Sequence, residues 1–115
     1  MTIEQSDIID FVSFEPGAGD VILTISDHLA WDENEREHLL LLQKKLNTYL
    51  EFIESGQLYD RYPRAKGRNV VLQVACKFPL SEQANRFVEL ASAAIAEAGF
   101  RLEIVFPEGV EKVPD

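Results

Sequence analysis

The sequence predicts an α+β fold: a two-layer sandwich in which two helices cover one face of a four-stranded sheet. Two segments show helical periodicity, four short segments are rich in strand-forming residues, and their order along the chain is ββαβαβ. Both helices are amphipathic, so each is expected to bury one face and leave the other in water. Short links around the second helix favour parallel strands on either side of it, which would make the sheet mixed.

The first two strands are predicted to form a β-hairpin. Residues 8–14 are rich in β-branched and aromatic side chains, and residues 21–26 place Val21, Leu23 and Ile25 on one face. The connection over residues 15–20 contains Pro16 and two glycines, which suit a tight turn.

The first helix is expected over residues 34–55. Its apolar residues recur at helical spacing: Leu39, Leu42, Leu46, Tyr49, Leu50 and Ile53. The polar residues placed off this face are Lys44, Lys45, Asn47, Glu51 and Glu54. Either Asp32 with Glu35 or Asn34 with Glu37 has the spacing of a capping box, and Gly56 supplies the stop.

The second half of the chain contains a strand, a helix and a last strand. Residues 57–68 are read as a connection, and residues 70–78 alternate like a strand with one buried face. Ser81 is expected to cap the second helix. Gly99 is expected to end it, with Phe100 in the position that a Schellman motif places against Ile95. Residues 101–106 form the last strand.

Length and composition indicate one domain spanning residues 1–115, with a core over 8–106 and loose tails at 1–7 and 107–115. The net charge of −9 disfavours nucleic acid and anionic membranes as partners, because both require a positive field. The single cysteine excludes an internal disulfide. Without a secretory signal pattern or a long apolar run, we expect a cytoplasmic protein.

The runs ISDHLAWD at residues 25–32 and HLLLLQKKLNTYLEFIESG at residues 38–56 resemble a family of small bacterial proteins catalogued as a domain of unknown function. The resemblance extends through Tyr62 and Pro63 into the third strand and so covers most of the chain. It implies a single α/β domain, and it supplies no activity, substrate or catalytic residue.

The loop over residues 27–31 is the first candidate ligand site, with His28 and Trp31 as its binding residues. His28, Asp32, Glu35 and His38 are spaced so that a folded-back loop could hold Zn²⁺ or Mn²⁺. The alternative, which we favour, is an acidic helix start with two unrelated histidines. Asp27 beside His28 could act as an acid–base pair, but an Asx turn or strand end explains Asp27 better. Cys76 is expected to be a buried apolar residue.

The second candidate is a basic loop in an otherwise acidic chain. Its proposed binding residues, for an anionic ligand or an acidic partner, are Tyr59, Arg61, Tyr62 and Arg64, followed by Lys66 and Arg68. The alternative is that these charges balance neighbouring carboxylates. If both loops lay at one end of the first helix, Trp31 and Tyr62 would wall a shared cleft.

The run Leu39–Leu42 has more leucines than one helix face needs, so Leu41 is expected to be exposed or to contact another chain. The alternative is that Leu41 packs under residues 57–68. Trp31 is read as a lid on the core or an interface anchor. We therefore predict a non-enzymatic protein-interaction or regulatory module with an unidentified protein partner, and consider a homodimer formed through the first helix or a sheet edge. The alternative is a small metal-binding protein or enzyme that uses the 27–31 loop. Sequence alone assigns no catalytic residue, metal ligand or cofactor, and whether the protein is an enzyme stays open.

Overall fold

A computed structural model describes residues 11–17, 19–32 and 34–106. The elements follow one another as β1 (Phe11–Phe14), β2 (Val21–Asp27), α1 (Glu35–Glu54), α2 (Gln57–Arg61), the 3₁₀ turn η1 (Pro63–Ala65), β3 (Val70–Cys76), α3 (Glu82–Glu97) and β4 (Arg101–Val105). The tails that the sequence predicts to be loose lie outside the described residues, as do residues 8–10 of the first predicted strand.

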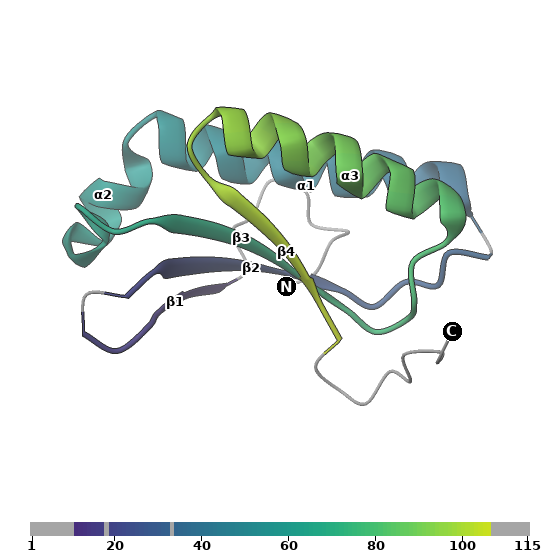
Figure 1. Cartoon of the computed structure of the whole chain (residues 1–115), viewed down its shortest axis with the longest axis horizontal. Helices are drawn as coiled ribbons and strands as arrows, with labels where there is room; N and C mark the ends of the chain where they lie inside the picture. Colours follow the sequence, from purple (N-terminus) through teal and green to yellow (C-terminus); the bar gives the residue numbers. More distant parts are fainter. Residues whose placement is uncertain (1–10, 18, 33, 107–115) are drawn as a thin grey trace.

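The four strands form one mixed sheet in the order β1-β2-β3-β4. β1 is antiparallel to β2, which confirms the hairpin, whereas β2, β3 and β4 run parallel. The two crossovers step in the same direction across the sheet, and crossovers of one hand then place their helices on one face. Figure 1 shows α1 and α3 side by side on that face. The predicted α+β fold, with helices on one face of a mixed sheet, is confirmed.

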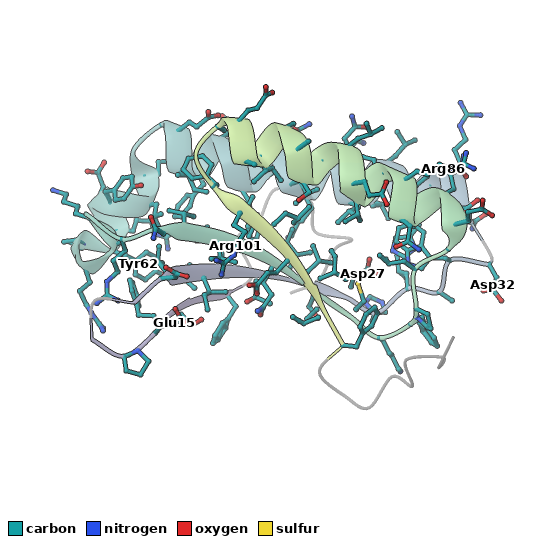
Figure 2. All side chains as sticks on the ribbon, in the orientation of Figure 1. Glu15, Asp27, Asp32, Tyr62, Arg86 and Arg101 are labelled. Atoms are coloured by element: carbon teal, nitrogen blue, oxygen red, sulfur yellow. The ribbon has the colours of Figure 1, made fainter. Side chains whose placement is uncertain are left out.

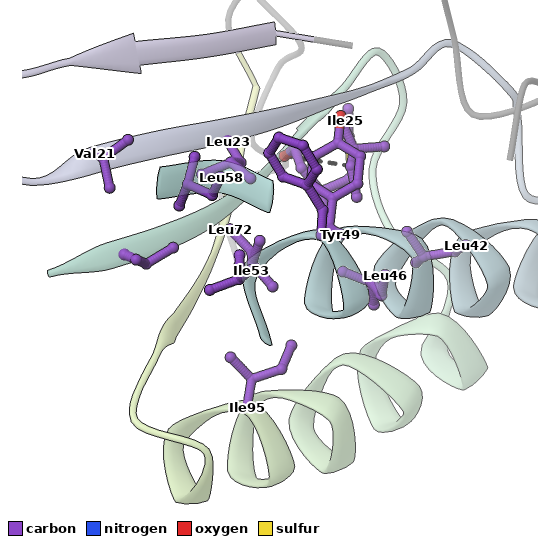
Figure 3. Close-up of a cluster of buried hydrophobic side chains, with 14 of the residues drawn as sticks. Val21, Leu23, Ile25, Leu42, Leu46, Tyr49, Ile53, Leu58, Leu72 and Ile95 are labelled. Carbon is purple, nitrogen blue, oxygen red and sulfur yellow. Dashed lines mark hydrogen bonds between the residues drawn. The ribbon is translucent and has the colours of Figure 1, made fainter. Parts of the chain in front are cut away.

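The core lies between this sheet and the two long helices. Alternate residues of β2 point toward the helices and are buried, and the parallel register sets Leu23 beside Leu72 and Ile25 beside Val74. Figure 3 shows Leu42, Leu46 and Tyr49 on α1, which runs along the helix-covered face of these strands. α3 contributes the buried residues Ala84 and Ile95 to the same cluster.

The helix ends follow the predicted stop signals. Gly99 has φ +96° and its N–H donates to the Ala96 carbonyl at 3.0 Å, while the Phe100 N–H donates to the Ile95 carbonyl at 3.0 Å. These two bonds make the predicted Schellman motif. Ser81 caps α3 as expected, its hydroxyl accepting from the Ala84 N–H at 3.1 Å.

The start of α1 corrects a prediction. Asn34 is the N-cap, and within the described part of the chain its side chain makes no capping hydrogen bond, so neither predicted capping box stands. The Asn34 backbone has φ −121° and ψ 65°, away from the extended geometry of the Ser81 cap. The first turn of α1 is held by a different contact, through His38.

Two residues of α1 differ from their predicted environments. Lys45 is 0% exposed rather than off the buried face, because it follows His38 by seven residues, two helical turns, on the same stripe. Its ammonium lies 5.8 Å from the centroid of the Tyr49 ring. In the leucine run, Leu40 is the exposed residue, whereas Leu41 is half-buried.

The predicted connection over residues 57–68 contains α2 and η1, which the sequence analysis missed. Arg68 ends this segment and holds the β1–β2 turn. Its guanidinium donates to the carbonyls of Glu15 at 3.1 Å, Gly17 at 2.7 Å and Gly19 at 2.8 Å, and its Nε to that of Arg64 at 2.9 Å. The connection is therefore ordered and packs against the β1–β2 turn.

The other face of the sheet carries a polar row. Thr24, Gln73 and Glu103 lie directly beside one another on β2, β3 and β4. Thr24 Oγ1 donates to Gln73 Oε1 at 3.3 Å, and Gln73 Nε2 donates to Glu103 Oε1 at 3.4 Å. No helix in the described ranges is long and apolar enough to span a membrane.

Candidate functional site

The carboxyl ends of β2 and β3 meet where α1 begins, and this is where parallel sheets commonly place their sites. Asp27, the last residue of β2, is in register with Cys76, the last residue of β3. Figure 2 shows Asp27 and the exposed Asp32 at this end of the molecule.

Asp27 and His38 form a buried pair at this edge. His38 Nε2 lies 2.6 Å from Asp27 Oδ2 and 2.8 Å from Oδ1, and the two side chains are 2% and 1% exposed. A carboxylate only accepts hydrogen bonds, so the tautomer that satisfies this contact is the one with the proton on His38 Nε2. Asp27 Oδ1 also accepts from the Leu29 N–H at 3.1 Å, which confirms the predicted Asx turn and strand end. The pair joins the end of β2 to the first turn of α1.

Trp31 covers the pair. Its ring stacks on the His38 imidazole with centroids 3.4 Å apart and an interplanar angle of 12°, and the residue is only 5% exposed. This confirms that Trp31 is a lid on the core. Trp31 Nε1 and His38 Nδ1 are both buried, and neither has a hydrogen-bond partner among the described residues. The second imidazole nitrogen is thereby closed off from solvent.

Cys76 adds no nucleophile to this edge. Burial, and to a lesser degree the charge of Asp27, raises the pKa of the Cys76 thiol from 9.0 to about 12. The thiol is therefore protonated at neutral pH, and the thiolate is the reactive form. Cys76 behaves as the buried apolar residue that the sequence predicts.

The metal constellation that the sequence analysis considered and did not favour is not assembled among the described residues. Asp27 pairs with His38 in the core, and the neighbouring His28 is exposed just after β2. Across residues 11–17, 19–32 and 34–106, no group of three or more His, Cys, Asp or Glu side chains is placed to hold a metal ion.

The basic loop lies at the opposite end of the molecule. Figure 2 shows Tyr62 beyond the far end of α1 from Asp27, and a helix of 20 residues is about 30 Å long. The two loops therefore lie at opposite ends of α1, and the condition for a shared cleft between Trp31 and Tyr62 is not met. The reason is that the connection returns to the amino end of β3, whereas Trp31 lies at the carboxyl end.

Within the basic loop, part of the charge packs on β1. The Arg64 guanidinium lies 4.5 Å above the Phe14 ring, and the Tyr62 ring is 6.1 Å from it. Tyr59 and Tyr62 are half-buried, whereas Arg61 is exposed. Of the predicted binding residues here, Arg61 and Arg64 remain at the surface.

A hollow of about 610 Å³ lies on the outer side of the first half of α1. We call it the α1 hollow; it is lined by Asn34, Glu35, Arg36, Glu37, Leu40, Leu41 and Lys44. Leu40 is 49% exposed there. A smaller hollow of about 310 Å³ lies between the starts of α1 and α3, beside Glu35 and Glu82.

Sequence reasoning missed the Asp27–His38 pair, although the signal was present. Asp27 continues the alternation of Val21, Leu23 and Ile25, so strand parity directs it to the core. His38 precedes Leu42 by four residues and so begins the buried stripe of α1. Two ionisable residues on facing buried stripes need each other as partners.

The comparisons with known proteins give a family and no activity. The model of a family described as "Family of unknown function (DUF6572)" matches residues 1–108. No curated protein and no solved structure matches the chain. Because the match spans nearly the whole sequence, the chain belongs to the DUF6572 family, whose function is not known.

Proposed function

We propose that this protein is a non-enzymatic protein-interaction module that binds a protein partner on the outer face of α1. The α1 hollow supports the proposal: an exposed leucine lies within a ring of charged side chains. Protein interfaces have this arrangement, with an apolar centre and a polar rim. Binding there would mask or regulate the partner without any chemical step.

The closed state of the Asp27–His38 pair supports the same proposal. A general base needs to reach its substrate within hydrogen-bond distance. Here one imidazole nitrogen is bound to Asp27, and the other is buried beside the Trp31 ring. The neighbouring thiol is held protonated. The side chains of Asp27, His38 and Cys76 are therefore enclosed, whereas Leu40 is exposed to solvent.

Co-purification from the native cells tests the proposal. The tagged wild-type chain should recover a protein at stoichiometric level across several salt concentrations, and Leu40→Asp should lose it. Leu90→Asp is the matched control, because Leu90 is an even more exposed leucine, at 74%, on the other long helix. Recovery that is the same for wild type and Leu40→Asp would refute binding at the α1 hollow.

A second candidate function uses the 27–31 loop in metal binding or catalysis. The observation in its favour is the Asp27–His38 hydrogen bond, since a carboxylate that orients an imidazole recurs in both settings. Thermal unfolding with added Zn²⁺ or Mn²⁺ separates the two functions. A midpoint that rises for wild type and not for His38→Gln or His28→Ala supports a metal site, and an unchanged midpoint refutes it.

The basic loop remains a proposed site for an acidic partner or ligand, through Arg61 and Arg64. The position of Arg64 over the Phe14 ring supports the alternative that its charge has a structural role. Arg61→Glu in the same co-purification tests this surface separately from the α1 hollow.

A further inference from the structure

We propose that the α1 hollow binds a second copy of this chain, with the two α1 helices antiparallel across a two-fold axis between Leu40 and Leu41. This inference uses the surface of the proposed function and rests on it: the second copy is a weak occupant of that surface, which a tighter protein partner would displace. It depends on how charge and apolar surface are ordered along the hollow.

Glu37 and Lys44 mark the two ends of the self-complementary stretch. They are seven residues apart, which is close to two helical turns, so both lie on one side of α1 about 10 Å apart along its axis. Both line the hollow, and Leu40 and Leu41 line it between them. The order along the helix is acid, two leucines, base.

A two-fold axis between Leu40 and Leu41 makes this order complementary to itself. In the antiparallel arrangement Glu37 faces Lys44 of the second copy, Leu40 faces its Leu41, and each contact occurs twice. A parallel arrangement would set Glu37 against Glu37 and Lys44 against Lys44. The charges therefore select one orientation of the second copy.

The local charge of the hollow also suits a second copy. The chain carries a formal net charge of −9, so two copies repel each other over most of their surfaces. The hollow differs, because its two acidic residues, Glu35 and Glu37, are balanced by Arg36 and Lys44. Among charged surfaces of this acidic chain, a neutral one with exposed leucine is where like copies can meet.

The size of the contact sets the expected affinity. One antiparallel helix pair buries less than the roughly 1,200 Å² of a small specific interface, and contacts of that size are weak. We therefore expect association between micromolar and millimolar concentration. Leu40 strengthens the association, because its exposed apolar surface would be removed from water on both copies.

Sedimentation velocity over that concentration range, on the full chain, tests the proposal. Wild type should pass from monomer to dimer, and Leu40→Asp should raise the dimer Kd at least about tenfold, equivalent to about 1.4 kcal/mol. Glu37→Lys and Lys44→Glu should each raise it about tenfold, and the double variant should return it to near the wild-type value. Leu90→Asp should leave it unchanged.

The charge exchange keeps the test independent of folding, because all these side chains line an open surface and the double variant restores the interaction. A strict monomer at millimolar concentration overturns the proposal. So does a dimer that Leu40→Asp does not weaken, which would point to the edge of β4, or a double variant no better than the single ones. If wild type is monomeric and co-purification still depends on Leu40, the proposed function stands with a different partner.

Discussion

Asp27 and His38 carry the largest single-residue consequences in this structure. Both side chains are enclosed, and the carboxylate receives hydrogen bonds from the imidazole and from the Leu29 N–H. Burying a carboxylate is costly unless it is paired and hydrogen-bonded. Each residue is therefore tolerated in the core because the other is present, and together they hold the end of β2 against the first turn of α1.

Replacing His38 by Ala should destabilise the fold by about 3–5 kcal/mol, because it leaves the Asp27 carboxylate buried without its main partner. Urea unfolding measures the change. Arg86→Ala is the control: its ion pair with Glu82 is on the surface of α3 and should contribute less than about 1 kcal/mol. Equal small losses in both variants would show that the Asp27–His38 pair is not buried as described.

The buried Cys76 thiol should lower the free energy of unfolding at alkaline pH. Burial raises the pKa of the folded thiol from 9.0 to about 12, so between these values the unfolded chain releases its proton first. The contribution is fully present below pH 9 and falls as pH rises toward 12, by up to about 1.4 kcal/mol per pH unit.

Urea midpoints of wild type and Cys76→Ala between pH 8 and 11 check this, since the range brackets the ordinary thiol pKa of 9.0. Cys76→Ala leaves a cavity whose cost does not depend on pH, so its midpoint should be lower than that of wild type at pH 8 and should lack the thiol-dependent slope. Parallel pH curves for the two proteins would count against a buried thiol.

Among the elements, the β1–β2 hairpin is stabilised from outside. Arg68 donates to three carbonyls of its turn and lies with Arg64 over the Phe14 ring. A lysine ammonium cannot reproduce this planar fork of donors. The hairpin therefore depends on a residue about fifty positions later in the sequence.

Arg68→Lys should cost about 1–3 kcal/mol, because hydrogen bonds from a charged donor are lost while the charge is kept. Arg61→Lys is the matched control on the same loop and should be nearly neutral, since Arg61 is exposed. Chemical denaturation of both variants measures the difference, and equal effects would contradict the role of Arg68.

The two helix starts give a paired prediction. Ser81→Ala should cost about 1 kcal/mol, because the hydroxyl that accepts from the Ala84 N–H is removed. Asn34→Ala should cost much less, since the Asn34 side chain makes no capping bond within the described residues. Thermal unfolding of the two variants compares them, and a larger loss at Asn34 would restore the predicted capping box.

Most elements of this fold follow from local sequence rules, and the exceptions have physical reasons. Strand alternation, helical spacing and the signals at Gly56, Ser81 and Gly99 depend on neighbouring residues, so the sequence predicts them. The parallel pairing of β2 with β3 joins segments far apart in the chain and has no local signature. The expectation that Lys45 lies off the buried face is wrong, because its position in the helical repeat places it on the buried stripe despite its charge.

The candidate site was less predictable than the fold. The loop at residues 27–31 adjoins the buried pair, and His38, which lies outside that loop, is the histidine that contacts Asp27 inside the core. The alternation of β2 directs Asp27 into the core and the helical repeat of α1 directs His38 there, so these two side chains meet. The separation of Trp31 from Tyr62 depends on the topology of the sheet, which the sequence did not determine.

For the whole molecule, the buried Asp27–His38 pair at the carboxyl edge of the sheet contrasts with the open α1 hollow, where an exposed leucine lies among charged side chains. The polar pair contributes to stability, and the proposed function assigns binding to the exposed Leu40. These two roles lie on opposite sides of the same helix, so variants can separate them.

The most direct test of this account is one co-purification experiment with two variants as bait, each first shown to be folded by thermal unfolding. Asp27→Asn/His38→Gln removes the acid–base groups and keeps a polar pair, whereas Leu40→Asp changes only the α1 hollow. The account predicts that the double variant recovers the wild-type partner and that Leu40→Asp does not. A partner lost with the double variant and kept with Leu40→Asp would contradict it and move the function to the buried pair.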